Sequence, residues 1–355
     1  MSLFKIESVL QRLCDSPEPD RRDLVFLLNL RRESDRRALF AFADKVRKEI
    51  LGNGVFLRGI IEFSNVCRNS CLYCGLNINN KKLQRYSLSR ERIMESVQEI
   101  SQSGIKTVVL QSGESAELDC FWLKDVIEEI KSRFGLAVTL SVGERRYEDY
   151  KAWREAGADR YLLKIETSNS ALYQSLHPGM SFEDRLRCLK DLKGLGYETG
   201  CGNIVGLKGQ TPEILAEDII FFKSRDFEMI GIGPFIPHHQ TPLGCYVSGD
   251  VNLTLVTLAL TRIVCKYPNM PATTALGSLG EDYRIDGLEA GANVLMPNFT
   301  PQPYRKLYEI YPGKRCVQEK SGSCASCMET MVRSIDREID YSRGDAVKAR
   351  KAANV

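Results

Sequence analysis

The chain has 355 residues, 43% of them hydrophobic and 27% charged, a composition typical of a globular protein with a substantial buried core. Its 49 Lys plus Arg against 46 Asp plus Glu give a net charge of +3, which excludes the strong field typical of nonspecific binding to nucleic acid or acidic membranes. The N-terminus lacks the apolar core of a signal peptide, and nowhere do about 18 apolar residues run together. We therefore expect a cytoplasmic protein without a membrane span.

The first 50 residues predict an N-terminal helical extension, because LVFLLNL and LFAFADKVRKEIL have apolar residues at helical spacing. Short strand-like runs then alternate with amphipathic helical patterns. Three of those patterns, residues 89–104, 125–135 and 181–196, end at Gly, which readily closes a helix. Eight runs predict strands: residues 55–63, 106–112, 136–142, 160–166, 198–206, 228–235, 270–276 and 292–297.

Strict alternation of strand and helix favours a parallel sheet that closes as a TIM-type (β/α)8 barrel over residues 51–310, with an open doubly wound sheet as the alternative. Residues 1–50 form the extension and residues 311–355 a C-terminal segment with a second cysteine triad. The charged tail after Ile335 is expected to be a solvated end. A closed barrel also suggests a tunnel from its bottom to a partner.

Three cysteines, Cys67, Cys71 and Cys74, follow the first predicted strand, at the end of the barrel where such folds place their chemistry. With 12 cysteines in a chain that is expected to keep them reduced, metal or redox chemistry explains this loop better than disulfides. A structural zinc needs a fourth ligand, and Cys120 and His177 lie far along the chain. Three thiolates on a four-iron cluster leave one iron open for a small molecule. An open zinc site and unligated core cysteines are the alternatives.

The CxxxCxxC spacing, with Tyr73 before the last cysteine, resembles the signature of radical S-adenosylmethionine (SAM) enzymes. Over about residues 55–330, the segments CLYCGL, VVLQSGE, GYETG, IGIGPFIPH, PATTA and YPGK resemble the diiron (FeFe) hydrogenase maturase family HydE, in the biotin synthase-like branch. The resemblance implies a 4Fe-4S cluster on the three cysteines whose open iron binds SAM. One electron then breaks the sulfur–carbon bond to give a 5'-deoxyadenosyl radical.

The resemblance also implies which residues bind SAM. Ser112, Gly113 and Glu114 match an element that receives the amino group, and a carboxylate suits an ammonium. Glu166 matches the carboxylate that accepts from the ribose hydroxyls, and Arg185 matches the arginine that pairs with the SAM carboxylate. Ile204 and Ile236 are expected to contact the adenine, and Tyr73 belongs to the cluster motif. Taken alone, SGE is also typical of a solvated turn, and Arg185 of a helix-surface charge.

Six further residues on inward faces of the predicted strands are expected to bind substrate: Gln111, Thr139, Lys164, Thr273, Thr274 and Met296. The hydroxyls of Thr273 and Thr274 could hold an anion or carboxylate, although threonine pairs are ordinary in strands and Met is common in cores. Lys164 opens a KIET sequence where the family has Arg-His-Glu-Thr, so a positive charge is kept without the planar guanidinium. This departure leaves the substrate open.

Near the C-terminus, Cys316, Cys324 and Cys327 could carry a second iron-sulfur cluster. The resemblance implies that the substrate is a small iron-cysteine complex that carries CO and cyanide. HydG would supply this substrate, and the product would go toward HydF. A low-potential donor would provide the electrons. Two alternatives remain. One is a HydE-like mutase or methylase that acts on an amino acid, as methylornithine synthase does, and the other is a non-catalytic iron-sulfur carrier.

Overall fold

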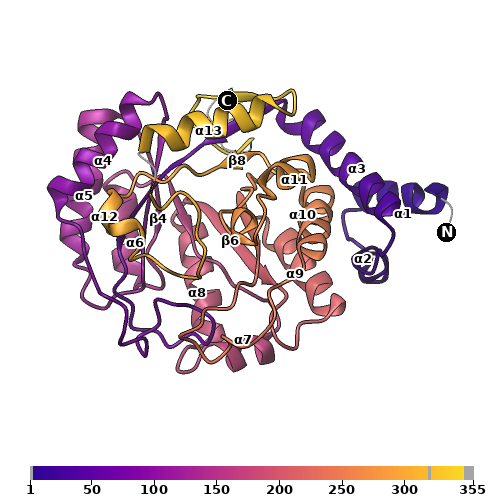
Figure 1. The fold of residues 1–355 in the computed structure, drawn as a ribbon, viewed down its shortest axis with the longest axis horizontal. Helices are drawn as coiled ribbons and strands as arrows, with labels where there is room; N and C mark the ends of the chain where they lie inside the picture. Colours follow the sequence, from indigo (N-terminus) through magenta and orange to yellow (C-terminus); the bar gives the residue numbers. More distant parts are fainter. Residues whose placement is uncertain (1–2, 319–320, 348–355) are drawn as a thin grey trace.

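The computed structural model describes residues 3–318 and 321–347, with parallel strands at the centre and helices around them (Figure 1). Six strands form one parallel sheet in the order β2-β3-β4-β5-β6-β7. They are β2 (Gly59–Ser64), β3 (Thr107–Ser112), β4 (Ala137–Ser141), β5 (Arg160–Leu162), β6 (Glu198–Val205) and β7 (Met229–Pro234). A second sheet has the order β8-β1-β9, with β1 (Gly54–Leu57), β8 (Val294–Leu295) and β9 (Glu338–Asp340).

The two sheets leave a gap between β7 and β2 that isolated parallel bridges cross. The bridges join Met229 with Asn269, Pro271 with Val294, and Ile60 with Asn298. The predicted parallel α/β barrel architecture is confirmed, with part of its ring reduced to single bridges and to the two-residue strand β8.

Besides the run 292–297, which contributes only the two-residue β8, three predicted strands differ from those observed. The run 55–63 is interrupted at Arg58, which donates to the carbonyl of Gly344 at 3.1 Å, and it forms β1 and β2. The run 160–166 ends as a strand at Leu162, and Glu166 has φ 63°, a left-handed conformation that an extended strand does not accommodate. The run 270–276 makes only the single bridge of Pro271 before it turns into the 3-10 helix η1 (Leu276–Ser278).

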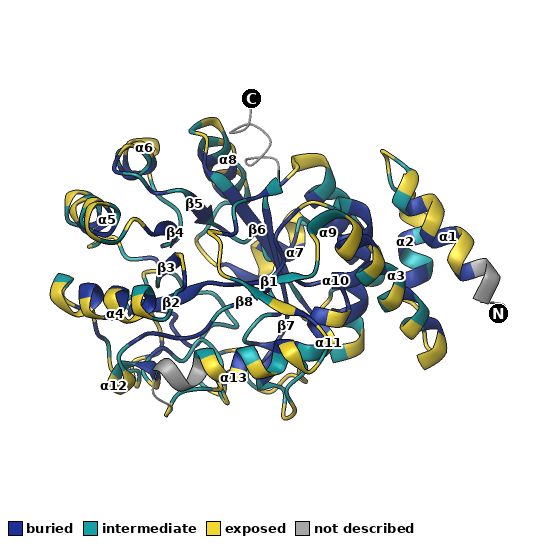
Figure 2. Ribbon diagram, turned by 90° about the horizontal axis from the view of Figure 1, so that it is seen from above, coloured by how far each residue is buried: buried dark blue, intermediate teal, exposed yellow. Residues whose placement is uncertain are grey.

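Helices cover the sheet with their buried faces inward (Figure 2). They are α4 (Arg90–Gln102), α5 (Cys120–Phe134), α6 (Tyr147–Glu155), α7 (Ser170–Leu176), α8 (Phe182–Gly194), α9 (Pro212–Arg225), α10 (Val251–Cys265), α11 (Arg284–Glu289) and α12 (Gln302–Arg305). The glycines predicted to close three helices, Gly104, Gly135 and Gly196, have φ of 82°, 61° and 76°. In the described part of the chain, no helix combines the length and hydropathy needed to cross a bilayer.

The N-terminal segment forms three helices, α1 (Leu3–Asp15), α2 (Arg21–Leu28) and α3 (Glu33–Leu51). They lie outside the helix layer, where α2 packs against α9 and α3 against α10 (Figure 1). The C-terminal segment contains α13 (Ser321–Arg333) and β9, which pairs with β1 in parallel.

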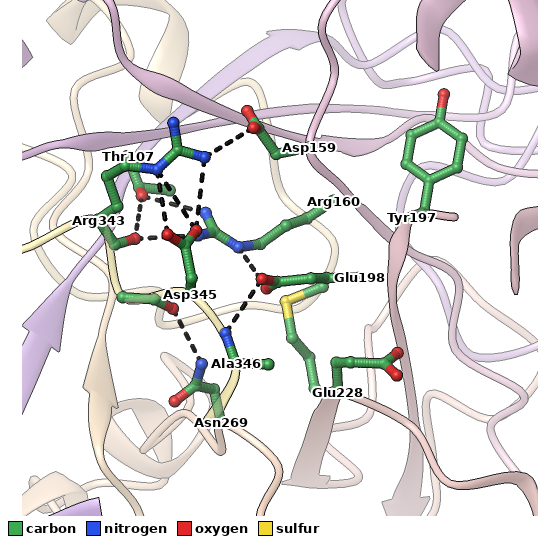
Figure 3. A network of polar contacts seen from close by, with 12 residues as sticks. Thr107, Asp159, Arg160, Tyr197, Glu198, Glu228, Asn269, Arg343, Asp345 and Ala346 are labelled. Carbon is green, nitrogen blue, oxygen red and sulfur yellow. Dashed lines mark hydrogen bonds and ion pairs between the residues drawn. The ribbon is translucent and has the colours of Figure 1, made fainter. Parts of the chain in front are cut away.

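Residues 343–346 pack against the N-terminal ends of β3, β5 and β6 (Figure 3). The fully buried Arg160 donates to Glu198 at 2.7 Å and to the carbonyl of Arg343 at 3.0 Å, and it pairs with Asp345. The N–H of Ala346 donates to Glu198 at 3.0 Å. A buried guanidinium requires such partners, and the tail supplies them. The prediction of a solvated tail is therefore wrong for residues 343–346, whereas residues 348–355 lie outside the described part of the chain. The tunnel stays a prediction.

Strand register fixes which side chains face the barrel interior. Arg160 lies in the floor and Leu162 would meet a Cβ placed on Gly200 of β6, whereas Tyr161 between them packs outward against Tyr150 and Tyr197. Because side chains alternate along an extended chain, the inward positions continue from Leu162 to Lys164.

Candidate functional site

The cysteine loop follows β2 at the C-terminal end of the barrel. Burial raises the pKa of the Cys71 thiol, the charges of Cys74 and Cys67 raise it further, and Arg185 opposes the increase. Burial likewise raises the pKa of Cys74 to about 12. Three half-buried thiols thus share one site with Arg185 nearby. Thiolates there are costly unless a bound cation compensates them, which suits an iron-sulfur cluster.

Among the residues that the structure describes, no three Cys, His, Asp or Glu side chains are placed to hold a single metal ion. A four-iron cluster makes no such demand, because each thiolate binds a different iron. The donor set therefore fits a cluster: three soft thiolate ligands on one short loop.

Two glycines and one arginine hold the cysteine loop. A Cβ on Gly75 would collide with the carbonyl of Glu309 and the ring of His238, and one on Gly113 would collide with the carbonyl of Val66. Gly113 is thus needed for the approach of β3 to this loop. Arg85, which the sequence did not single out, donates to the carbonyls of Asn65, Leu76 and Asn77 at 2.7 to 2.8 Å.

Tyr73 and His177 lie together beside the loop. The Tyr73 hydroxyl is 2.8 Å from Nε2 of His177, and Nδ1 of the same ring is 2.8 Å from the carbonyl of Tyr173. Burial lowers the pKa of His177 to about 4, so the ring is neutral at physiological pH. Nδ1 then donates to the carbonyl and Nε2 accepts from Tyr73. Both nitrogens are engaged, so His177 supports the loop instead of completing a ligand set.

Each charged residue expected to bind SAM has an internal counter-ion. Oε1 of Glu114 accepts from Arg68 at 2.9 and 3.0 Å, and Arg185 pairs with Glu144 at 2.5 Å. The N–H of Glu144 donates to Oε2 of Glu114 at 2.8 Å, so the two pairs are joined. Glu144 is a functional candidate that the sequence analysis missed, although it ends SVGE after β4 as Glu114 ends QSGE after β3.

Glu166 lies on the neighbouring strand end. Nζ of Lys164 is 2.9 Å from Oε2 of Glu166, yet this buried oxygen accepts no well-aligned hydrogen bond from the described residues. The backbone carbonyl of Lys164 accepts from the Arg185 guanidinium. Lys164 therefore contacts both Glu166 and Arg185.

The other residues expected around SAM are separated. Tyr73 and Ile204 pack in one small apolar cluster with Leu207 and Phe235. Ile236 is buried just after β7. The Ser112 hydroxyl donates to the carbonyl of Gly113 at 2.7 Å, and Ser112 lines a pocket of about 530 Å³ between the N-terminal ends of α4 and α5.

Two of the residues expected to bind substrate have polar groups directed into the barrel. Nε2 of Gln111 donates to the hydroxyl of Tyr308 at 3.1 Å. The buried Thr139 hydroxyl has no hydrogen-bond partner within the described part of the chain. The Thr273 hydroxyl donates weakly to the carbonyl of Ile232 at 3.4 Å, whereas Thr274 and Met296 line a separate small cavity. The structure thus places Thr273 and Thr274 in different surroundings.

That cavity also contains a buried ion pair that the sequence analysis missed. Glu62 of β2 pairs with Lys314 and accepts from Asn298 at 3.0 Å. Lys314 Nζ lies 5.0 Å from the centre of the Tyr308 ring. An acid within the apolar run VFLRGIIEF was the available signal, because a buried carboxylate needs a partner.

The second cysteine triad is only partly described. Cys316 has φ 60°, and its carbonyl accepts from Arg305 at 3.2 Å. Cys327 is exposed on α13. The side chain of Cys324 lies outside the described residues, so the prediction for the triad stays a prediction.

Comparisons with known proteins identify relatives of this chain. The radical SAM superfamily model matches residues 61–222. The chain is 49% identical over 93% of its length to the FeFe hydrogenase maturase subunit HydE of Thermotoga maritima, and covers 94% of that protein. It is 31% identical to the 3-methylornithine synthase of Methanosarcina acetivorans, with 77% of each chain covered. The crystal structure of methylornithine synthase (PylB) superimposes with a TM-score of 0.85 and 25% identity, covering 98% of this chain and 100% of that one.

Proposed function

The chain belongs to the radical SAM superfamily and, within it, to the HydE family, and we propose from this premise that it cleaves SAM reductively in the assembly of the diiron site of FeFe hydrogenase. The observation that carries this proposal is that the half-buried thiols of Cys67, Cys71 and Cys74 share one site beside Arg185. The three thiolates would hold three irons of a 4Fe-4S cluster and leave the fourth open to SAM. When bound, the cluster supplies the electron that splits the sulfur–carbon bond.

The charged residues around the loop would position SAM. Glu114 would receive the amino group, Arg185 the carboxylate and Glu166 the ribose hydroxyls. All three now have internal counter-ions: Arg68, Glu144 and Lys164 respectively. On binding SAM, these three residues would therefore exchange their internal counter-ions for groups of SAM. The net free energy of binding would be the difference between the contacts with SAM and the internal ion pairs that are lost. Ile204 and Ile236 would form the apolar surroundings of the adenine, Tyr73 would belong to the cluster motif, and Ser112 and Gly113 would help Glu114 to receive the amino group.

The barrel interior would hold a small iron-cysteine complex with CO and cyanide. The residues proposed to contact it are Gln111, Thr139, Lys164, Thr273, Thr274 and Met296. Because residues 343–346 pack across the N-terminal end, substrate would enter from the side of the cysteine loop, where the walls then exclude water. HydG would supply the substrate, HydF would receive the product, and a low-potential protein would provide electrons. Cys316, Cys324 and Cys327 would hold a second cluster.

A second candidate is a radical SAM mutase or methylase that acts on an amino acid. The likeness to 3-methylornithine synthase in sequence and in structure favours it. Lys164 and Ile165 stand where the resemblance to HydE leads us to expect Arg and His, so a simple amino acid carboxylate is an alternative ligand for Lys164.

The experiment is anaerobic reconstitution with iron and sulfide, followed by measurement of 5'-deoxyadenosine formed with and without the iron-cysteine complex. The variant Cys67/Cys71/Cys74→Ala is compared with Cys120→Ala, which leaves the loop intact. Cleavage that needs the three cysteines and accelerates with the complex would support the maturase. Cleavage that ignores the complex but accelerates with an amino acid would favour the second candidate, and no cleavage from an intact cluster would indicate a carrier.

A further inference from the structure

Lys164 connects the barrel interior with two residues proposed to hold SAM. Its Nζ is 2.9 Å from Oε2 of Glu166, and its carbonyl accepts from the guanidinium of Arg185. Its side chain is 26% exposed, whereas that of Lys314, in the small cavity with Thr274 and Met296, is 7% exposed and paired with Glu62. An anion that enters the barrel therefore meets a lysine whose partner is shared with the SAM site.

The backbone of Glu166 is fixed, so its response to Lys164 is confined to the side chain. The N–H of Glu166 donates to Gly202 at 3.0 Å, and its carbonyl accepts from Ile204 at 3.1 Å. These bonds hold the residue at φ 63°, a conformation that is costly for a residue with a Cβ. The carboxylate can turn while the main chain stays in place.

The contact between Lys164 and Glu166 is electrostatic but poorly aligned. The N···O separation of 2.9 Å is that of a strong ion pair, yet Oε2 accepts no aligned hydrogen bond from the described residues. A buried carboxylate oxygen without an aligned donor is under-satisfied and favours a new donor. The ammonium meanwhile attracts that oxygen and holds it beside Lys164.

We propose that Lys164 couples the two ligands of the barrel: the carboxylate of an incoming substrate attracts Nζ away from Glu166 and frees the Glu166 carboxylate to accept the ribose hydroxyls of SAM. The inference rests on the proposed function and adds that substrate binding increases the affinity for SAM. Because coupling between two binding sites is reciprocal, SAM also increases the affinity for the anionic substrate. Lys164 is a positioning residue that acts on SAM through Glu166.

The test measures the dissociation constant of SAM for the cluster-loaded protein by anaerobic equilibrium dialysis. The probe is L-serine, which has the shape and carboxylate of cysteine without a thiol that binds iron. L-serine amide is the matched control that lacks the carboxylate. In the wild type, L-serine should tighten SAM binding at least about fivefold, the lower end of typical coupling. The amide should leave the affinity unchanged.

Substitutions at Lys164 separate coupling from a structural role. Lys164→Met should bind SAM more tightly than the wild type in the absence of L-serine, since the competing ammonium is gone, and should lose the response to L-serine. Lys164→Arg, which keeps the charge, should retain a response and serves if the Met variant folds poorly. The coupling would be overturned if L-serine left the affinity of the wild type for SAM unchanged. It would also be overturned if the Met variant bound SAM more weakly and its affinity still increased with L-serine. SAM cleavage that depends on the iron-cysteine complex would still support the proposed function.

Discussion

Asp218 of α9 accepts two hydrogen bonds from Ser168, one from the backbone N–H at 2.6 Å and one from the hydroxyl at 2.7 Å. The same buried carboxylate accepts from the Asn203 amide at 2.9 Å. Ser168 lies two residues after Glu166, so an acid on an outer helix fixes the turn that presents Glu166 at the mouth of the barrel.

Replacement of Asp218 should affect both stability and SAM binding. Asp218→Ala leaves the donors of Ser168 and Asn203 without their acceptor, and we expect the free energy of unfolding to fall by about 3 kcal/mol. SAM should bind more weakly because Glu166 loses its support. Urea unfolding and SAM dialysis measure the two effects. Glu217→Ala, which removes the exposed pair with Arg21, is the control and should change stability by less than about 0.5 kcal/mol. Equal effects of the two substitutions would contradict the role of Asp218.

The buried His177 should make the metal-free protein less stable in acid. Its folded pKa of about 4 lies below the ordinary 6.5, so only the unfolded state binds the proton between these values. The free energy of unfolding should therefore fall as pH drops from 6.5 toward 4, by up to about 3 kcal/mol from this residue. His177→Gln should flatten the dependence, and His239→Gln, at an exposed position, should not. Parallel curves for the wild type and His177→Gln would refute the assignment.

The cysteine loop should hold iron without His177 or Cys120. Alanine at Cys67, Cys71 or Cys74 should each remove the cluster, a loss of about four iron atoms per chain. His177→Gln and Cys120→Ala should keep the iron and sulfide content of the wild type, because neither side chain completes the ligand set. Loss of the cluster from either control would identify a fourth protein ligand.

The second cysteine triad should be dispensable for SAM cleavage. The variant Cys316/Cys324/Cys327→Ala should lose at most the iron of one further cluster, up to about four atoms. Its rate of 5'-deoxyadenosine formation with a chemical reductant should match the wild type. Loss of cleavage from a folded variant that retains the first cluster would assign the triad a role in the radical chemistry.

The floor of the barrel should depend strongly on Arg160. Arg160→Met leaves Glu198 and Asp345 without their shared guanidinium, and we expect a loss of about 3 to 5 kcal/mol in the free energy of unfolding. Arg343→Ala should cost less, because its side chain is 42% exposed. Urea unfolding monitored by circular dichroism compares the two. A floor that tolerates Arg160→Met without loss would show that residues 343–346 are not held by this arginine.

The helix ends and most strands were predictable because their signals are local. Gly104, Gly135 and Gly196 close helices in the conformation that their place after an amphipathic pattern indicates. The strand predicted at 270–276 was wrong because threonine and alanine are acceptable in strands, while the turns of this segment depend on contacts with the neighbouring β7. The charged tail failed for a similar reason: its Asp345 is attracted by Arg160, which is distant in sequence.

The sequence by itself determined the cysteine loop and the succession of strands that carries it. Three ligands within eight residues need no tertiary contact to be near one another. Only the tertiary structure decided the partners of the charged residues. Glu114 and Arg68 are 46 residues apart, Arg185 and Glu144 are 41 apart, and Lys314 and Glu62 are 252 apart. The physical reason is that a buried charge pairs with whichever opposite charge the folded barrel brings within reach, and that proximity is a property of the packed chain.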